Sequence, residues 1–180
     1  MNKQPEITAK TKQNLVTAFC DLYMEKPINK ITIKEIAARA GYNRSTFYQY
    51  FDDVYDVLAY VENELLSTWK SYENIHDSLF RPNLHQLLAL FECKEQYLRA
   101  VLSDYGSTHF LERLKQELSF HSLSQFFPED EKLLPYLVEF HLSTSLSLFR
   151  TWLKNGEDMA TDELFELIHN LYTKGISYFI

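Results

Sequence analysis

The sequence predicts an all-α protein, on the evidence of its composition and its periodicity. Only four of the 180 residues are glycine, whereas 46% are hydrophobic and 15% aromatic, which argues against disorder and against a fold rich in turns. Apolar residues recur at helical spacing over long stretches of the chain. A chain of this length is long enough to bury a sizeable core, as one domain or as two small ones.

The first two helices are expected at Thr8–Lys26 and Ile33–Ala40. The first has a stripe of apolar residues at helical spacing, and the second has apolar residues at i, i+3, i+4 and i+7. Thr32 and Glu35 have the spacing of a capping box, in which each side chain satisfies a free backbone N–H of the other residue. Gly41 ends the second helix, because glycine tolerates the left-handed backbone conformation of a C-cap.

A third helix is expected at Arg44–Phe51, with Asn43 as its cap. Phe47 and Phe51 are one turn apart and share a buried face, while Ser45 and Gln49 project on the opposite side. Two short helices joined by a glycine-bearing turn are typical of a helix-turn-helix, whose second helix reads the major groove of DNA. The alternative is an ordinary helical hairpin with exposed polar residues.

The remainder of the chain is expected to form a helical body. Its expected helices cover residues 53–72, 83–93, 95–104, 108–127, 131–154 and 161–180. Asp52 or Asp53 is expected to cap the first of these helices, and Thr161 or Asp162 the last.

Charge is distributed unevenly along the chain. The whole sequence has a net charge of −7, which by itself argues against a nucleic-acid ligand. Residues 1–51, however, hold eight lysines and arginines against four acidic residues. The remaining residues hold ten lysines and arginines against twenty-one acidic residues. A basic head on an acidic body concentrates the attraction for phosphates at one end of the molecule.

Several classes of function have no support in the sequence. Cys20 and Cys93 have no metal or redox spacing, so we expect both to be buried apolar residues in a reducing compartment. The six histidines form no metal-ligating pair, and no nucleophile motif or glycine-rich phosphate loop occurs. We therefore expect no enzyme activity, no metal and no cofactor. Neither a signal peptide nor a membrane-spanning segment is expected.

The segments ITIKEIAARAG and NRSTFYQYF resemble the DNA-binding domain of the TetR/AcrR family of transcriptional regulators. The residues that carry this resemblance are Thr32, Ile36, Ala37, Ala40, Gly41, Thr46, Phe47, Tyr48, Tyr50 and Phe51. The resemblance is strong over about residues 11–58. Many members carry a phosphate-binding lysine where this chain has Val54, and Asp52–Asp56 instead resembles a subgroup that includes regulators of dihydroxyacetone metabolism.

The resemblance implies a cytoplasmic, homodimeric repressor that binds a pseudo-palindromic operator and is released by a small effector. Residues 1–52 then form the helix-turn-helix DNA-binding domain, and residues 53–180 the helical domain for dimerisation and effector binding. The alternative is a helical co-regulator that acts through a protein or metabolite partner with weak or no DNA binding. No effector-binding residue is predicted.

Two sets of site residues follow from these interpretations. The predicted DNA-binding residues are Thr32, Lys34, Asn43, Arg44, Ser45, Thr46, Tyr48, Gln49 and Tyr50. Among them Arg44, Ser45 and Gln49 are the candidates for base contacts. The resemblance implies phosphate or positioning contacts for five others, namely Thr32, Lys34, Thr46, Tyr48 and Tyr50. The predicted dimer interface consists of Leu142, Ser145, Leu148, Phe149, Trp152, Leu164, Ile168 and Leu171.

Overall fold

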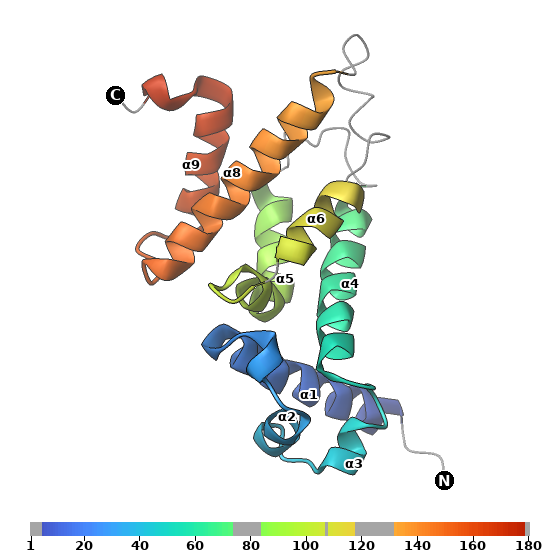
Figure 1. Cartoon of the computed structure of the whole chain (residues 1–180). Coiled ribbons are helices and arrows are strands. Elements are labelled where there is room, and N and C mark those ends of the chain that lie inside the picture. Colours follow the sequence, from blue (N-terminus) through green and yellow to red (C-terminus); the bar gives the residue numbers. More distant parts are fainter. Residues whose placement is uncertain (1–4, 74–83, 107, 118–131, 179–180) are drawn as a thin grey trace. The chain divides into compact units, whose positions relative to one another are not determined.

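The computed structural model describes residues 5–73, 84–106, 108–117 and 132–178. Every regular element within these ranges is a helix, which confirms the predicted all-α class (Figure 1). The chain divides into two compact units, Met1–Leu65 with Gln96–Gly106, and Leu66–Glu95 with Ser107–Ile180. The domain boundary after residue 52 stays a prediction, and the first unit takes in a later segment that the sequence pattern did not assign to it.

The first unit, called the head below, is built on α1 (Pro5–Glu25), η1 (Ile28–Lys30), α2 (Ile33–Arg39), α3 (Arg44–Phe47) and the first half of α4 (Val54–Glu73). Helix α1 begins three residues before the predicted start, because Pro5 suits the first helical turn and Glu6 favours its positive end. The core of the head consists of apolar side chains at helical spacing, among them Leu15, Phe19, Tyr23, Ile36, Phe47, Val57 and Val61.

Helix α5 (Leu84–Leu102) covers the two helices predicted over 83–104. The backbone at Lys94 is non-helical, with φ −128° and ψ 23°, so the predicted break is present as a kink inside one element. Beyond the kink, Gln96 Nε2 donates to Asp21 Oδ1 of α1 at 2.8 Å. Tyr97 donates its hydroxyl to Gln13 Oε1 at 3.1 Å, and these two bonds hold the second half of α5 in the head.

The second unit, called the body below, contains α6 (Thr108–Glu117), α8 (Leu134–Lys154), α9 (Thr161–Lys174) and η2 (Ile176–Tyr178). Residues 118–127 of the predicted helix 108–127 lie outside the described residues. Pro135 stands in the first turn of α8, as predicted, where its missing N–H costs no helical hydrogen bond.

Helix α9 differs from its predicted bounds at both ends. Its N-cap is Ala160, not Thr161 or Asp162, and the Glu163 carboxylate accepts from the Ala160 N–H at 2.9 Å. It ends at Lys174, before the predicted residue 180, because Gly175 has φ +73° and turns the chain.

The body core lies where α8 and α9 pack on each other (Figure 1). Phe149 of α8 is buried with its ring centroid 6.2 Å from that of Phe165 in α9. Trp152 donates its indole N–H to the Met159 carbonyl at 2.7 Å, which closes the α8–α9 connection onto α8.

Five residues of the predicted dimer interface are already buried within this single chain, namely Leu142, Phe149, Trp152, Leu164 and Ile168. Ser145 is half-buried and shares a hydrogen bond of 3.0 Å with the Tyr172 hydroxyl. Leu148 and Leu171 are half-buried as well. The apolar stripe of α8 therefore has a partner inside the chain, and the dimer interface itself stays a prediction.

The two cysteines differ in their surroundings. Cys20 is buried, as predicted, and burial raises the pKa of its thiol far above the ordinary value. Cys93 is exposed, so its prediction as a buried residue was wrong. It directly precedes the kink at Lys94, where no helical stripe directs it into a core. No helix among the described residues is long and apolar enough to cross a membrane.

Candidate nucleic-acid interface

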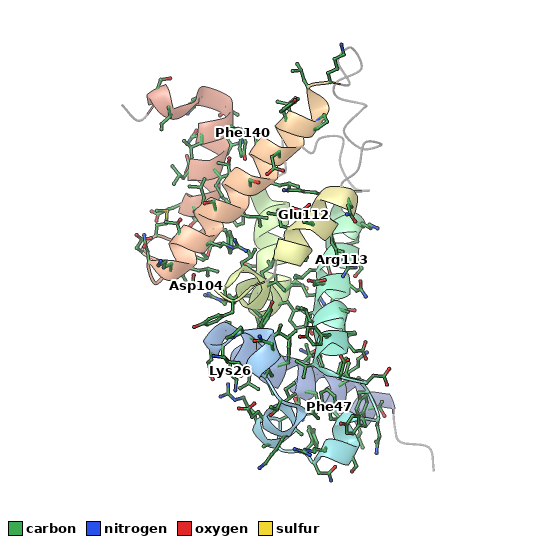
Figure 2. All side chains as sticks on the ribbon, in the orientation of Figure 1. Lys26, Phe47, Asp104, Glu112, Arg113 and Phe140 are labelled. Carbon is green, nitrogen blue, oxygen red and sulfur yellow. The ribbon has the colours of Figure 1, made fainter. Side chains whose placement is uncertain are left out.

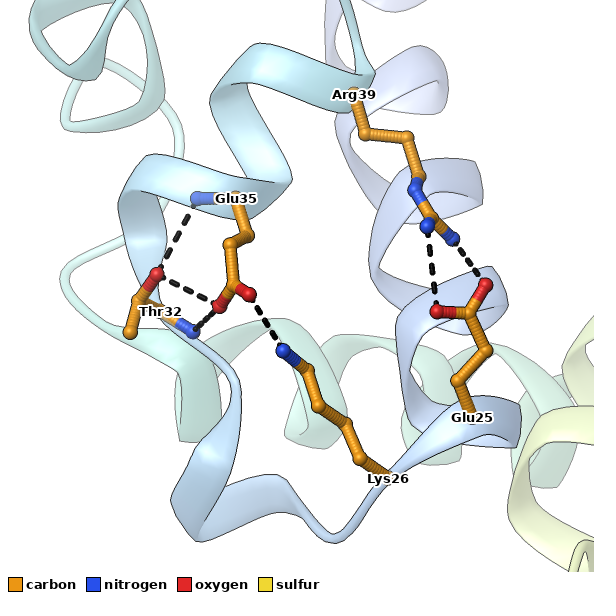
Figure 3. A network of polar contacts seen from close by, with 5 residues as sticks. All are labelled: Glu25, Lys26, Thr32, Glu35 and Arg39. Carbon is orange, nitrogen blue, oxygen red and sulfur yellow. Dashed lines mark hydrogen bonds and ion pairs between the residues drawn. The ribbon is translucent and has the colours of Figure 1, made fainter.

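Helix α2 begins with the capping box that the sequence predicted. The Thr32 hydroxyl accepts from the Glu35 N–H at 3.3 Å, and Glu35 Oε2 accepts from the Thr32 N–H at 3.0 Å and from its hydroxyl at 2.8 Å. Lys26 Nζ donates to the other carboxylate oxygen (Figure 3). The hydrogen bond with Lys26, followed by those with Thr32, lowers the pKa of Glu35 from 4.5 to about 2. The Thr32 hydroxyl hydrogen is thus engaged in the cap, and its predicted phosphate contact stays a prediction.

A second ion pair joins α2 to α1. Arg39 donates Nη1 to Glu25 Oε1 at 2.7 Å and Nη2 to Oε2 at 3.2 Å, a bidentate arrangement (Figure 3). The hydrogen bond from Arg39 lowers the pKa of Glu25. Together with the Lys26–Glu35 pair, this contact fixes α2 against the end of α1.

The turn after α2 has the geometry that its glycine predicts. Gly41 has φ +79°, and its N–H donates to the Ala38 carbonyl at 3.1 Å. The Tyr42 N–H donates to the Ala37 carbonyl at 2.8 Å, which completes a Schellman motif. The Tyr42 hydroxyl accepts from Asn14 Nδ2 of α1 at 3.1 Å, so the turn is also tied to the first helix.

Asn43 caps α3 as predicted. Its Oδ1 accepts from the Thr46 N–H at 2.9 Å, from the Ser45 hydroxyl at 2.6 Å and from the Thr46 hydroxyl at 3.1 Å. The α-helical part ends at Phe47, four residues short of the predicted end. Bonds of the i to i+3 type follow, from the Gln49 N–H to Thr46 and from the Tyr50 N–H to Phe47, so the last turn is tighter than an α-helix.

Two buried aromatic rings pack α3 and the turn after it into the core of the head. Phe47, labelled in Figure 2, and Phe51 are buried. Their ring centroids lie 5.8 Å apart, which confirms the predicted shared face. Phe51 also contacts Tyr60 of α4 at 5.8 Å. Lys12 Nζ lies 3.8 Å from the Tyr60 ring centroid and 5.3 Å from that of Phe51, a cation–π arrangement that the sequence analysis missed.

Most of the predicted DNA-binding residues are exposed, and all come from α2, the turn and α3. The exposed ones are Thr32, Lys34, Asn43, Arg44, Ser45, Tyr48 and Gln49, while Thr46 and Tyr50 are half-buried. Tyr48 is 58% exposed although its ring is large and apolar. Within the described part of the chain, Lys34 and Arg44 have no ion-pair or hydrogen-bond partner, so their charges are available to a ligand.

Val54 stands where the resembling family often has a phosphate-binding lysine, and it is buried at the start of α4. The acidic residues around it serve as helix caps. Asp53 Oδ1 accepts from the Asp56 N–H at 2.9 Å, and Asp56 Oδ2 accepts from the Asp52 N–H at 3.1 Å. These bonds account for the acidic segment structurally and confirm Asp53 as the cap.

Comparisons with known proteins agree with this geometry. Residues 15–61 match the model of the family described as bacterial regulatory proteins, tetR family. No curated protein matches the chain. A TetR transcriptional regulator from Streptococcus agalactiae 2603V is similar in structure, with a TM-score of 0.61 and 24% identity over 93% of this chain and 96% of that chain.

Two further solved structures share the fold. One is a tetR-family transcriptional regulator from Streptomyces coelicolor, with a TM-score of 0.64 and 18% identity over 94% of this chain and 82% of that chain. The other is the fatty acid degradation regulator FadR from Bacillus halodurans, with a TM-score of 0.59 and 16% identity over 98% of each chain. Residues 15–61 therefore form a helix-turn-helix domain of the tetR type, in a chain with the fold of TetR regulators.

Proposed function

We propose that this chain is a cytoplasmic one-component transcription regulator that binds operator DNA through α2 and α3. The observation that carries the proposal is the two-sided character of α3. Phe47 on one side of α3 is buried, while Arg44 and Ser45 on the other side, and Gln49 in the turn that follows, are exposed. The side chains needed for reading bases are thus held on a rigid element and face solvent.

The exposed charges support a division of roles on this surface. Arg44 lies at the start of α3, and arginine is the residue that most often makes a bidentate contact with guanine in the major groove. Lys34 lies on α2, which crosses the DNA backbone in a helix-turn-helix complex, so we assign it a phosphate. Tyr48 and Tyr50 are assigned to phosphate or positioning contacts as well.

DNA binding is tested by fluorescence anisotropy of the full-length protein on labelled fragments from upstream of its own gene. Arg44→Ala should weaken binding to the preferred fragment at least tenfold, whereas Lys154→Ala, which removes an exposed cation of the body, should leave it unchanged. If the wild type shows no preference among fragments, and Arg44→Ala binds as well as Lys154→Ala, the proposal fails and the co-regulator alternative takes its place. The resemblance of Asp52–Asp56 to regulators of dihydroxyacetone metabolism supports that alternative.

We also propose that the protein acts as a homodimer on a pseudo-palindromic operator. Two copies read half-sites one helical turn apart, about 34–36 Å, and two-fold symmetry in the protein matches the palindrome. Helix α8 still exposes large apolar residues in the single chain. Tyr136 is 75% exposed, and Phe140, labelled in Figure 2, is 60% exposed. The Phe140 ring still contacts the Tyr172 ring, with 5.9 Å between their centroids.

This dimer is tested by sedimentation velocity at micromolar concentration. Tyr136→Glu with Phe140→Glu should convert a dimer into a folded monomer, because both side chains are mostly exposed in their own chain. Tyr105→Glu changes an exposed aromatic residue of the head and should leave the dimer intact. A wild-type monomer, or a double variant that stays dimeric, would contradict an interface on these helices.

We further propose that the protein is a repressor, released from its operator by a small effector bound in the body. Release requires that the effector bind one arrangement of the dimer better than the other, and thermodynamic linkage makes this coupling reciprocal. Operator DNA should therefore weaken effector binding by the same factor by which the effector weakens DNA binding. Equal effector affinity with and without DNA would leave the body without a sensing role.

A further inference from the structure

Arg150 of α8 has an unsatisfied donor in the body. Its Nε is buried from solvent and, among the residues that the structure describes, is the one buried side-chain nitrogen or oxygen without a hydrogen-bond partner. A guanidinium is always charged and carries five N–H donors, so its buried donors normally have acceptors. An orphaned arginine donor inside a unit therefore requires an explanation.

The contacts of α8 place Arg150 on the side of the helix that faces α6. Glu139 lies on that side, because its carboxylate pairs with Lys115 of α6 at 2.6 Å. Arg150 follows Glu139 by eleven residues, about three turns, so the two residues share one face. The neighbouring Phe149 contacts Phe165 of α9, so the side of α8 that faces α9 is a different side from the one that carries Arg150.

The two carboxylates that the structure describes on this side, Glu139 and Glu112, already have partners. Glu139 accepts from the Ser143 hydroxyl at 2.6 Å in addition to its pair with Lys115. The pair with Lys115 lowers the pKa of Glu139 and raises the pKa of Lys115, so both groups stay charged and paired at neutral pH. Glu112 is the second partner of Lys115, at 3.3 Å. None of these carboxylates pairs with Arg150, so among the described residues its positive charge has no counter-ion.

We propose that Arg150 binds the carboxylate of a small effector with an apolar body. A guanidinium fork matches the two oxygens of a carboxylate, and one unpaired cation neutralises a monoanion, not a phosphate dianion. Helix α6, which packs against this side of α8, buries Phe110 and Leu114, so the surroundings suit an apolar remainder. This inference names the chemical class of the effector in the proposed function and rests on that function.

The competing explanation is structural. Arg150 lies in the last turns of α8, where a cation interacts favourably with the helix dipole, and a long side chain can bury its stem while its head reaches water. This explanation predicts that Arg150 stabilises the apo protein and has no effect on carboxylate binding. The two explanations therefore differ in two measurable quantities.

Ligand affinity is the first quantity, measured by isothermal titration calorimetry of the full-length protein. The probes are sodium octanoate, sodium decanoate and sodium phenylacetate, each compared with the primary alcohol of the same carbon skeleton. At least one carboxylate should bind the wild type at least tenfold more tightly than its alcohol. Arg150→Gln should abolish this advantage, and Lys154→Gln, which changes an exposed cation one turn later, should retain it. Equal affinities for acid and alcohol, no binding by any probe, or an unchanged advantage in Arg150→Gln would overturn the proposal.

Stability without ligand is the second quantity. Arg150→Met keeps the unbranched stem and removes the orphaned donor, so it should raise the midpoint of thermal unfolding by about 2–4 °C. A lower midpoint would mean that Arg150 has a structural partner and would overturn the proposal. DNA binding by the same variants is measured separately. If the protein binds operator DNA but binds no carboxylate more tightly than its alcohol, this inference alone fails. If it binds a carboxylate more tightly than its alcohol but does not bind operator DNA, the proposed function fails.

Discussion

Asn43 shows how a structural role and a DNA-binding role can be separated at one position of the interface. Helix α3 has only one α-helical turn, Arg44–Phe47, so its start depends on the cap more than a long helix would. Removal of the Asn43 amide in Asn43→Ala takes away the side-chain acceptor of the Thr46 N–H, which keeps only its bond of 3.1 Å to the Asn43 backbone carbonyl. The hydroxyls of Ser45 and Thr46 lose the same acceptor but can turn to water, because Ser45 is exposed and Thr46 half-buried.

The expected cost is that of one N-cap, about 1 kcal/mol within a range of 0.5–2. For a chain of 180 residues this corresponds to a fall of roughly 2–4 °C in the midpoint of thermal unfolding. Asn43→Ser and Asn43→Asp should cost little, because serine and aspartate cap helices as well as asparagine does. Circular dichroism melts of the three full-length variants measure these differences.

Operator binding then distinguishes the two roles. If Asn43 acts only as a cap, Asn43→Ser binds DNA like the wild type, and Asn43→Ala loses affinity in proportion to its loss of stability. Asn43→Asp keeps the cap but adds a negative charge beside the phosphates, so it should lose affinity without losing stability. Anisotropy titrations at two salt concentrations make the comparison. An Asn43→Ser protein that is as stable as the wild type but fails to bind would refute this reasoning and assign Asn43 a direct contact.

Four further outcomes are expected. Lys34→Ala should weaken binding to all DNA fragments alike and reduce the salt dependence, with a slope about one unit smaller, and an unchanged slope in anisotropy titrations would remove Lys34 from the phosphate contacts. Gln49→Ala should instead relax the preference at one base pair, by about 1–3 kcal/mol for a bidentate contact, and a uniform loss over a set of operator variants would contradict base readout. Glu35 has a lowered pKa, so its carboxylate stabilises the head above pH 4.5 and loses this contribution as the pH falls towards about 2. The stability difference between wild type and Glu35→Gln in urea melts should therefore shrink across that window, and a constant difference would contradict the assignment. Lys12→Met should lower the free energy of unfolding by about 0.5–2 kcal/mol, because the cation–π contacts are lost. Lys10→Met, at an exposed position, should change it little. Equal effects of the two substitutions in urea melts would argue against the ring contacts.

The features that the sequence predicted correctly are those that depend on neighbours along the chain. The capping box of Thr32 and Glu35, the cap at Asn43 and the pair of Phe47 and Phe51 all join residues three or four positions apart. Helix geometry alone brings such residues together, so their spacing is sufficient evidence. The positive φ at Gly41 follows in the same way from a residue type that tolerates it.

The features that the sequence did not predict join residues that are distant along the chain. Gln96 bonds to Asp21 across 75 positions, and nothing in either local pattern indicates the other. The sequence predicts that the stripe on α8 contacts a partner copy, and it gives no sign that Phe149 and Leu142 of this stripe are buried within one chain. The dimer interface itself stays a prediction. An apolar stripe specifies that a helix is covered, but it does not specify by which surface. Packing decides that question, and packing depends on the whole chain.

The attraction between the head and DNA phosphates likewise depends on contacts between residues that are distant along the chain. Residues 1–51 hold eight lysines and arginines against four acidic residues, but two of those cations are not available to a ligand. Lys26 and Arg39 are paired with Glu35 and Glu25, so each pair contributes little field beyond a Debye length, about 10 Å at 0.1 M salt. The field that a phosphate meets comes instead from the exposed cations, above all Lys34 on α2 and Arg44 at the start of α3. The ion pairs of the head thus orient the recognition elements, while the unpaired cations on those elements supply the attraction, and a charge count cannot separate these two contributions.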